Sequence, residues 1–316
     1  RVWGINFDMA VLTNVSEEHI EYHGSFENYL RAKGLLFSGL NRSTRKPRIS
    51  KVSILNKDDA HFVYFDQFLV DREYTYGMGS GTCFATNVRA TTQGTEFTLN
   101  IPNNQIEICM KLPGEFNVYN ALAAATVGIA NNVSLNVIKA GLERAGIIPG
   151  RFESIDGGQK FSIIVDYAHT ADSLEKVLVL YRKLTKGKLY LVFGCTGGGR
   201  DKAKRQKMGA VAEKYADYIV VTDDDPYGDN EWDIIQMVSA GIKRKEGDGF
   251  WKIPDRKQAI KLALSQAVAG DTVVIAGKGA EELQMIRGTK IPWDDRKVVR
   301  ELLAHAVQVE IVAKRP

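Results

Sequence analysis

The second half of this sequence alternates apolar runs with helix-like segments, and this pattern constrains the fold more than any other feature. Runs typical of buried strands occur at FSIIVDY (161–167), KLYLVFG (188–194), DYIVVTD (217–223) and DTVVIAG (271–277). Segments with helical periodicity lie at 172–184, 203–215, 231–244 and 256–268. The alternation predicts a parallel sheet covered by helices, and ligands of such sheets bind at the carboxyl ends of the strands. The stretches DYAHT, GCTGGGRD, TDDDPYG and GKGAEE all fall at those ends.

The first half predicts a different arrangement. A strand ends within FDMAVLTN (7–14), and a helix is predicted over 25–40, with Ser25 as its N-cap. Within 49–112, stretches with alternating apolar and polar residues predict short antiparallel strands: KVSILN, HFVYF, TCFATNVRATTQGTEFTLNI and QIEICMKL. Helices are predicted over 113–132 and 134–145. Proline and glycine in IIPGRFESIDGGQ place a domain boundary near Pro149-Gly150, which gives domains 1–149 and 150–316.

Composition excludes several classes of protein. A chain of 316 residues is long enough for two domains with a core each. The net charge of +4 is too small to indicate nucleic-acid binding. Cys83, Cys109 and Cys195 are too far apart for a zinc motif or a disulfide framework, which favours a reducing cytoplasm. No apolar run approaches the roughly 18 residues of a membrane span, so no membrane insertion is expected.

The glycine-rich stretch FGCTGGGRDKAKRQKMG (193–209) lies where a phosphate-binding loop would lie, after an apolar run and before a helix. A P-loop requires G-x-x-x-x-G-K-[ST], but here Gly199 is followed by Arg200 and Asp201. The stretch GKGAEEL (277–283) has no hydroxyl residue after its lysine. A nucleotide site in this chain is therefore incomplete, or it is built from other residues.

Two residues near the N-terminus are candidates for metal chemistry. His19 lies in an acidic loop after a strand end, where it could neighbour magnesium or phosphate or be an ordinary polar loop residue. Lys33 lies inside the helix predicted over 25–40, where a solvated lysine is the common case. Neither residue decides a function without further evidence.

Polar residues around the domain boundary are candidates for ligand contacts. Asn117 and Asn120 share one helix face and could read an adenine edge, although Asn117 could equally cap the helix. Arg151 follows a glycine turn, where it could bind phosphate or form an interdomain salt bridge. Asp166 ends a strand before YAHT (167–170), which is the context of a ligand-facing carboxylate.

Three consecutive carboxylates, Asp223, Asp224 and Asp225, precede a proline in TDDDPYG. Such groups repel one another unless a cation is near, so a metal ion or a ligand ammonium group is one interpretation. The alternative is a turn whose aspartates cap the following helix. The sequence pattern does not decide between a cation site and a helix-capping turn.

These stretches together carry a resemblance to a known family. TNVSEEHIEYHGSFENYLRAK, GEFNVYNALAA, GRFE, VDYAHT, FGCTGGGRDKAKRQKMG, VVTDDDPY and GKGAEELQ occur in the family's order and near its spacing. The chain resembles a Mur ligase, most closely the branch of UDP-N-acetylmuramoyl-tripeptide synthetases. The resemblance implies an α/β fold, with part of a central ATP-binding domain that carries added antiparallel strands (1–149). A Rossmann-like parallel-sheet domain that binds an amino acid would follow (150–316).

The resemblance also implies roles for individual residues. Lys33 matches the lysine that the family carbamylates to help hold Mg²⁺, and His19 matches a magnesium ligand, so both would be catalytic and metal-binding. The residues that match nucleotide contacts are Asn117, Asn120, Arg151, Asp166 and His169. Arg200 matches the residue that binds the carboxylate of the incoming amino acid. The other positions that match the substrate site are Asp224, Asp225, Tyr227, Gly277 and Glu281.

The reaction implied by the resemblance is ATP-dependent amide formation through an acyl phosphate, with Mg²⁺, in a cytoplasmic monomer. Its substrates would be a UDP-muramoyl dipeptide and a diamino acid. The family's N-terminal UDP-sugar domain, its P-loop and an acidic metal ligand are missing before Arg1, so residues 1–316 are expected to be inactive on their own.

The third amino acid stays open between meso-diaminopimelate and lysine. Branch members that use meso-diaminopimelate typically have Asn and Arg where this chain has Asp225 and Tyr227, whereas Arg200 and GCTGGGRD fit that class. Two other functions compete with this reading: another Mur-fold ligase, of the cyanophycin-synthetase or folylpolyglutamate type, and a non-catalytic amino-acid-binding module.

Overall fold

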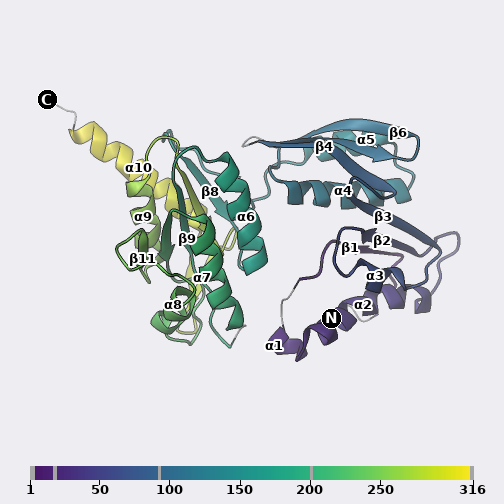
Figure 1. Cartoon of the computed structure of the whole chain (residues 1–316), viewed down its shortest axis with the longest axis horizontal. Coiled ribbons are helices and arrows are strands. Elements are labelled where there is room, and N and C mark those ends of the chain that lie inside the picture. Colours follow the sequence, from purple (N-terminus) through teal and green to yellow (C-terminus); the bar gives the residue numbers. More distant parts are fainter. Residues whose placement is uncertain (1–3, 17–19, 92–93, 200–201, 314–316) are drawn as a thin grey trace. The chain divides into compact units, whose positions relative to one another are not determined.

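The computed structural model describes residues 4–16, 20–91, 94–199 and 202–313. The chain divides into two compact units, Arg1–Gly146 and Ile147–Pro316 (Figure 1). The sequence pattern predicts the boundary a few residues later, near Pro149-Gly150. Each unit has its own sheet and its own buried core.

The first unit is built on a mixed sheet with the strand order β1-β2-β3-β4-β5-β6. Its strands are β1 (Met9–Leu12), β2 (Val52–Asn56), β3 (Arg72–Met78), β4 (Cys83–Thr91), β5 (Gly94–Ile101) and β6 (Asn104–Met110). Strands β1 to β4 pair in parallel, and β4, β5 and β6 pair antiparallel. The antiparallel strands predicted over 49–112 are thus correct for the later stretches and wrong for KVSILN, because β2 lies between two parallel neighbours.

Helices cover this sheet. They are α1 (Ile20–His23), α2 (Phe26–Arg42), α3 (Phe62–Asp66), α4 (Glu115–Ala130) and α5 (Leu135–Arg144). The Ser25 hydroxyl accepts a hydrogen bond from the Asn28 amide, which confirms the predicted N-cap of α2. The stretch HFVYF was predicted as a strand, but it forms α3, whose Phe65 packs against Phe37 of α2. The His61 amide donates a hydrogen bond to the Asp59 carboxylate, which turns the chain into this helix.

The second unit contains the predicted parallel sheet. Its strand order is β11-β10-β9-β12-β8-β7, with β7 antiparallel to β8 and the other pairs parallel. The strands are β7 (Glu153–Ser154), β8 (Ser162–Asp166), β9 (Leu189–Phe193), β10 (Tyr218–Val221), β11 (Phe250–Lys252) and β12 (Thr272–Ala276). A hairpin of β13 (Leu283–Ile286) and β14 (Thr289–Pro292) forms a separate small sheet. Strands β8, β9, β10 and β12 confirm the apolar runs read from the sequence.

Helices lie on both faces of this sheet: α6 (Ala171–Leu184), α7 (Ala203–Tyr215), α8 (Glu231–Ser239), α9 (Arg256–Gln266) and α10 (Asp295–Ala313). Figure 1 shows α9 and α10 on one side of the sheet and α6 and α7 on the other. The side chains of β9 are all buried, because helices cover both of its faces. Helix α8 ends at Ser239, before the predicted residue 244. The glycine that follows, Gly241, packs closely on α7, since an added Cβ would lie 2.9 Å from the Gly209 carbonyl carbon.

Candidate functional site

The loops that follow β8, β9, β10 and β12 meet at one edge of the second sheet, as the strand pattern predicts. The Gly277 amide donates to the Asp166 carbonyl at 3.1 Å, which joins the β12 and β8 loops. The Gly197 amide donates to the Asp225 carbonyl at 2.7 Å, which joins the β9 and β10 loops. Most of the residues that the sequence assigns to substrate or nucleotide therefore lie on connected loops of a single unit.

An acidic cluster lies at this edge, and it surrounds a lysine. Asp224, Asp225 and Glu281 are the group of carboxylates, among the residues described, that could hold a metal ion. However, the side chain of Lys278 is fully buried between them. Its Nζ lies 3.0 Å from Asp225 Oδ1, 2.9 Å from Glu281 Oε2 and 3.5 Å from Asp224 Oδ1. The position that a cation would take is thus filled by the chain's own ammonium group.

Burial and neighbouring charges shift the pKa values of Asp224 and Lys278 in this cluster. Burial raises the pKa of Asp224 above its ordinary value, although the positive charges of Arg256 and Lys278 oppose that shift. Burial by itself would lower the pKa of Lys278, but the carboxylates around it raise it overall. The ammonium is therefore held charged. Three carboxylates face one ammonium, so the ionised cluster keeps a negative surplus that can attract a ligand cation. Glu281 has the most exposed side chain of the three, at 39%.

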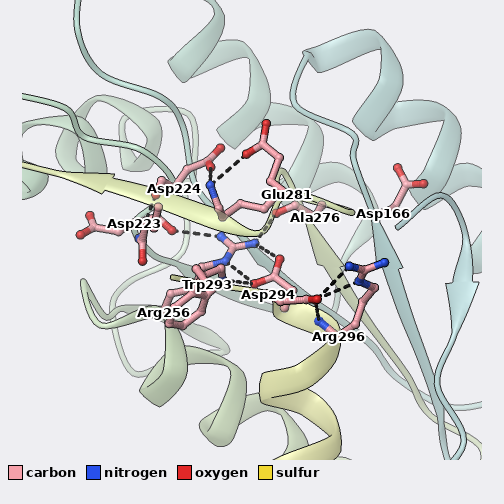
Figure 2. Close-up of polar contacts among 12 residues, drawn as sticks. Asp166, Asp223, Asp224, Arg256, Ala276, Glu281, Trp293, Asp294 and Arg296 are labelled. Atoms are coloured by element: carbon pink, nitrogen blue, oxygen red, sulfur yellow. Dashed lines mark hydrogen bonds and ion pairs between the residues drawn. The ribbon is translucent and has the colours of Figure 1, made fainter. Parts of the chain in front are cut away.

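A second buried ion pair braces the same edge, and sequence analysis missed it. The fully buried Arg256 guanidinium binds both carboxylate oxygens of Asp295, at 2.8 and 2.7 Å. It also donates to the carbonyls of Asp223 and Ala276, at 3.0 and 2.9 Å (Figure 2). Arg256 thus ties the ends of β10 and β12 to the start of α10, and it sets the spacing of the loops that carry Asp224 and Gly277.

The glycine-rich loop after β9 packs against the loop after β10. A Cβ added at Gly198 would lie 3.2 Å from the Tyr227 ring, so a side chain there would displace that ring. The Tyr227 backbone has a positive φ of 55°, and its amide donates to the Met285 carbonyl at 3.0 Å. The buried Arg205 donates to the Thr196 carbonyl at 3.0 Å. Arg200, the predicted carboxylate contact, lies outside the described residues.

The predicted nucleotide contacts of the second unit lie together. The buried Asp166 carboxylate accepts hydrogen bonds from the amides of Phe152 and Ala168, at 2.9 and 2.8 Å. Burial raises the pKa of Asp166, although these amides lower it. The Arg151 guanidinium carbon lies 4.3 Å from the centre of the Tyr167 ring, and the His169 ring lies 4.6 Å from it. Asp166 therefore holds the turn that carries Arg151, and Tyr167 is a central residue that sequence analysis passed over.

The candidates in the first unit form no comparable cluster among the residues described. Lys33 is exposed, and its Nζ lies 5.1 Å from the centre of the Tyr29 ring. His19 lies outside the described residues. Asn117 donates to the Pro113 carbonyl at 2.8 Å and accepts from Asn120 at 3.2 Å, so the two share one helix face as predicted. The described residues do not assemble a magnesium site, since the carboxylates that could form one already bind Lys278.

Each of the two units matches a domain of a known protein family. Residues 1–128 match the Mur ligase middle domain, and residues 150–279 match the glutamate ligase domain of Mur ligases. The chain belongs to the Mur ligase family. The two matched domains occur in the order of the two units, and together they span most of the sequence. The α/β fold inferred from the sequence is therefore that of the family.

Curated relatives and solved structures are similar to this Mur ligase over most of its length. It is 44% identical over 303 residues to the UDP-N-acetylmuramoyl-L-alanyl-D-glutamate–2,6-diaminopimelate ligase of Geobacillus kaustophilus and 41% identical to that of Bacillus cereus. The alignments cover 95% and 96% of this chain, which spans only 61% of each relative. A solved structure of a ligase with that name matches with a TM-score of 0.60 at 31% identity, over 97% of this chain and 62% of the other.

More distant structures share the fold only. The folylpolyglutamate synthase of Mycobacterium tuberculosis matches with a TM-score of 0.67 at 19% identity, over 96% of this Mur ligase and 64% of that chain. In the part of the chain that the structure describes, no helix is long and apolar enough to cross a membrane.

Proposed function

We propose that the protein is an ATP-dependent ligase that adds a diamino acid to the D-glutamyl residue of UDP-N-acetylmuramoyl-L-alanyl-D-glutamate, a step of peptidoglycan precursor synthesis. The observation that carries this proposal is the 44% identity to a ligase named for this reaction, over 95% of the chain. The loops joined at the edge of the second sheet support it, because they gather the charged groups that such a substrate requires. We also propose that the enzyme is cytoplasmic and monomeric.

The reaction proceeds in two steps. A carboxylate oxygen of the glutamyl residue attacks the γ-phosphorus of ATP, which forms an acyl phosphate and releases ADP. The amine of the diamino acid then attacks the acyl carbon, loses a proton and expels inorganic phosphate, which leaves an amide. The contribution of this chain is to hold the amine donor in position, because a correctly oriented amine reacts far faster than one free in solution.

The second unit supplies the amino-acid site. Glu281 presents the most accessible carboxylate of the Lys278 cluster, and we assign it to an ammonium group of the substrate. Lys278 already binds three carboxylates, so it is poorly suited to pair with a further carboxylate of the ligand. Asp225 and Tyr227 stand at the positions that discriminate between diamino acids. These features favour a substrate whose distal end carries an amine and no carboxylate, such as lysine, whereas the relatives' names favour diaminopimelate.

A ligation assay tests the proposal. The protein expressed from its complete gene is mixed with ATP, Mg²⁺ and the muramoyl dipeptide, and phosphate release is measured with meso-diaminopimelate, L-lysine or no amino acid. We expect release that depends on one of the diamino acids, and no release when a folate replaces the dipeptide. Calorimetry that detects amino-acid binding by a protein that never ligates would instead favour a binding module. The described residues form no magnesium site, so we derive no step through the metal.

Carbamylation of Lys33 is a separate part of the proposal. A carbamate would turn this exposed ammonium into an anion, which is the chemistry that a metal ligand requires. We expect a ¹³C carbamate resonance in protein incubated with labelled bicarbonate, and we expect Lys33→Ala to remove both the resonance and the ligation activity. The exposed Lys57, which precedes Asp58 in the same unit, offers a control: Lys57→Ala should keep the resonance. The absence of a ¹³C carbamate resonance in wild-type protein incubated with labelled bicarbonate would contradict this assignment.

A further inference from the structure

Tyr167 lies between the side chains that we assign to the nucleotide and the carboxylate that we assign to the amino acid. We propose that Tyr167 is a positioning residue that couples the two, so that occupation of the amino-acid site orders Arg151. This inference rests on the proposed function, because that function assigns the ligands at either end. Three sets of contacts support it, one on the face of the ring, one at its hydroxyl and one in the backbone.

The Tyr167 ring touches two of the predicted nucleotide contacts, Arg151 and His169. The Arg151 guanidinium lies over its face at 4.3 Å, a distance at which a cation is attracted to an aromatic ring. The His169 ring meets it edge-on at 4.6 Å, and His169 Nδ1 lies 2.9 Å from the Tyr167 carbonyl. A shift of the Tyr167 ring would therefore move the surface on which Arg151 rests.

The hydroxyl end of Tyr167 faces the acidic cluster. Burial raises the pKa of Tyr167, and the charge of Glu281 and a hydrogen bond to that carboxylate raise it further. Glu281 is held in turn by Lys278 at 2.9 Å. An ammonium group that binds Glu281 fixes this carboxylate, and with it the group that holds the Tyr167 hydroxyl. Since the ring of a tyrosine is rigid, a change at its hydroxyl reaches the face that contacts Arg151.

The backbone connects the same two segments without room for a side chain. A Cβ added at Gly279 would lie 2.5 Å from the Gly150 carbonyl oxygen and 2.8 Å from Tyr167 Cβ. A Cβ added at Gly150 would lie 2.0 Å from the Ala280 amide nitrogen. The turn that carries Arg151 is thus packed directly on the loop that carries Lys278 and Glu281. Glycine at both positions allows this approach, and Tyr167 fills the space beside it.

Steady-state kinetics of the protein from its complete gene test this coupling, with ATP and the diamino acid varied separately. Tyr167→Phe keeps the ring and removes the hydroxyl. We expect it to raise the KM for the diamino acid about tenfold, as for the loss of a hydrogen bond to a charged group. We also expect it to raise the KM for ATP at saturating diamino acid, because the bound amino acid then no longer orders Arg151. Tyr167→Leu removes the ring as well, and we expect it to raise both KM values. In a protein that already carries Glu281→Gln, Tyr167→Phe should not raise the KM for the diamino acid any further.

Tyr190→Phe is the matched control, because it removes a tyrosine hydroxyl that donates to the Gln266 carbonyl at 3.1 Å within the same unit. It should leave both KM values at the wild-type level. The inference is overturned if Tyr167→Phe leaves the KM for ATP at the wild-type level, or if it lowers kcat and leaves both KM values unchanged, as a loss of folded protein would. A wild-type protein that does not ligate overturns the proposed function and this inference with it.

Discussion

Asp223 is a partly buried carboxyl group beside the Lys278 cluster, and its environment makes stability depend on pH. Burial and the nearby charge of Glu231 raise its pKa from 3.8 to about 7. The folded state therefore holds the proton more tightly than the unfolded state. The stability linked to this group is present at pH 4, and it is lost as the pH rises toward 7 and the buried carboxylate ionises.

Replacing Asp223 by asparagine removes this penalty. We expect Asp223→Asn to stabilise the second unit by roughly 2 kcal/mol more at pH 8 than at pH 5, because the penalty keeps growing until folded Asp223 ionises near pH 7. Denaturant midpoints at both pH values measure the difference. The exposed Asp248 provides the control, since Asp248→Asn should have the same small effect at both pH values. An equal gain for Asp223→Asn at pH 5 and pH 8 would contradict this account.

At the scale of elements, one arginine joins two strand ends and a helix. Arg256→Met should destabilise the second unit by roughly 3–5 kcal/mol, because it leaves the buried Asp295 carboxylate without its cation. Lys257 is the next residue of the same helix and pairs with Glu301 in solvent, so Lys257→Met should cost under about 1 kcal/mol. Chemical denaturation of the two variants gives the comparison. Equal losses in the free energy of unfolding would show that the buried Arg256–Asp295 pair does not stabilise this edge of the sheet.

The elements were predictable where burial leaves a continuous pattern. The parallel strands β8, β9, β10 and β12 were found because their side chains are almost all buried, whereas β3 (Arg72–Met78) was missed because its first two residues are charged and exposed. HFVYF is too short for its period to separate a helix from a strand. The sequence placed Asp225 and Glu281 at one edge. It could not show Lys278 between them, because that contact with Asp225 joins residues 53 positions apart.

At the scale of the whole molecule, each unit buries a core of its own. The second unit packs Val192, Val274 and neighbouring strand residues beneath its helices, and the first unit has separate clusters around Leu99 and Phe37. At the start of the second unit, Ile147 and Ile148 are more than half exposed. A segment whose apolar side chains remain in solvent contributes little to either core.

We therefore expect residues 147–316 to fold when expressed alone, with a cooperative thermal transition and native-like circular dichroism. The same transition should be visible within the full chain, and Arg256→Met should lower its midpoint there while leaving a transition of residues 1–146 in place. Differential scanning calorimetry of the fragment, the full chain and the variant provides the comparison. If the fragment is unfolded, or if Arg256→Met shifts every transition of the full chain equally, the two units depend on each other for stability, and the account of two separate cores fails.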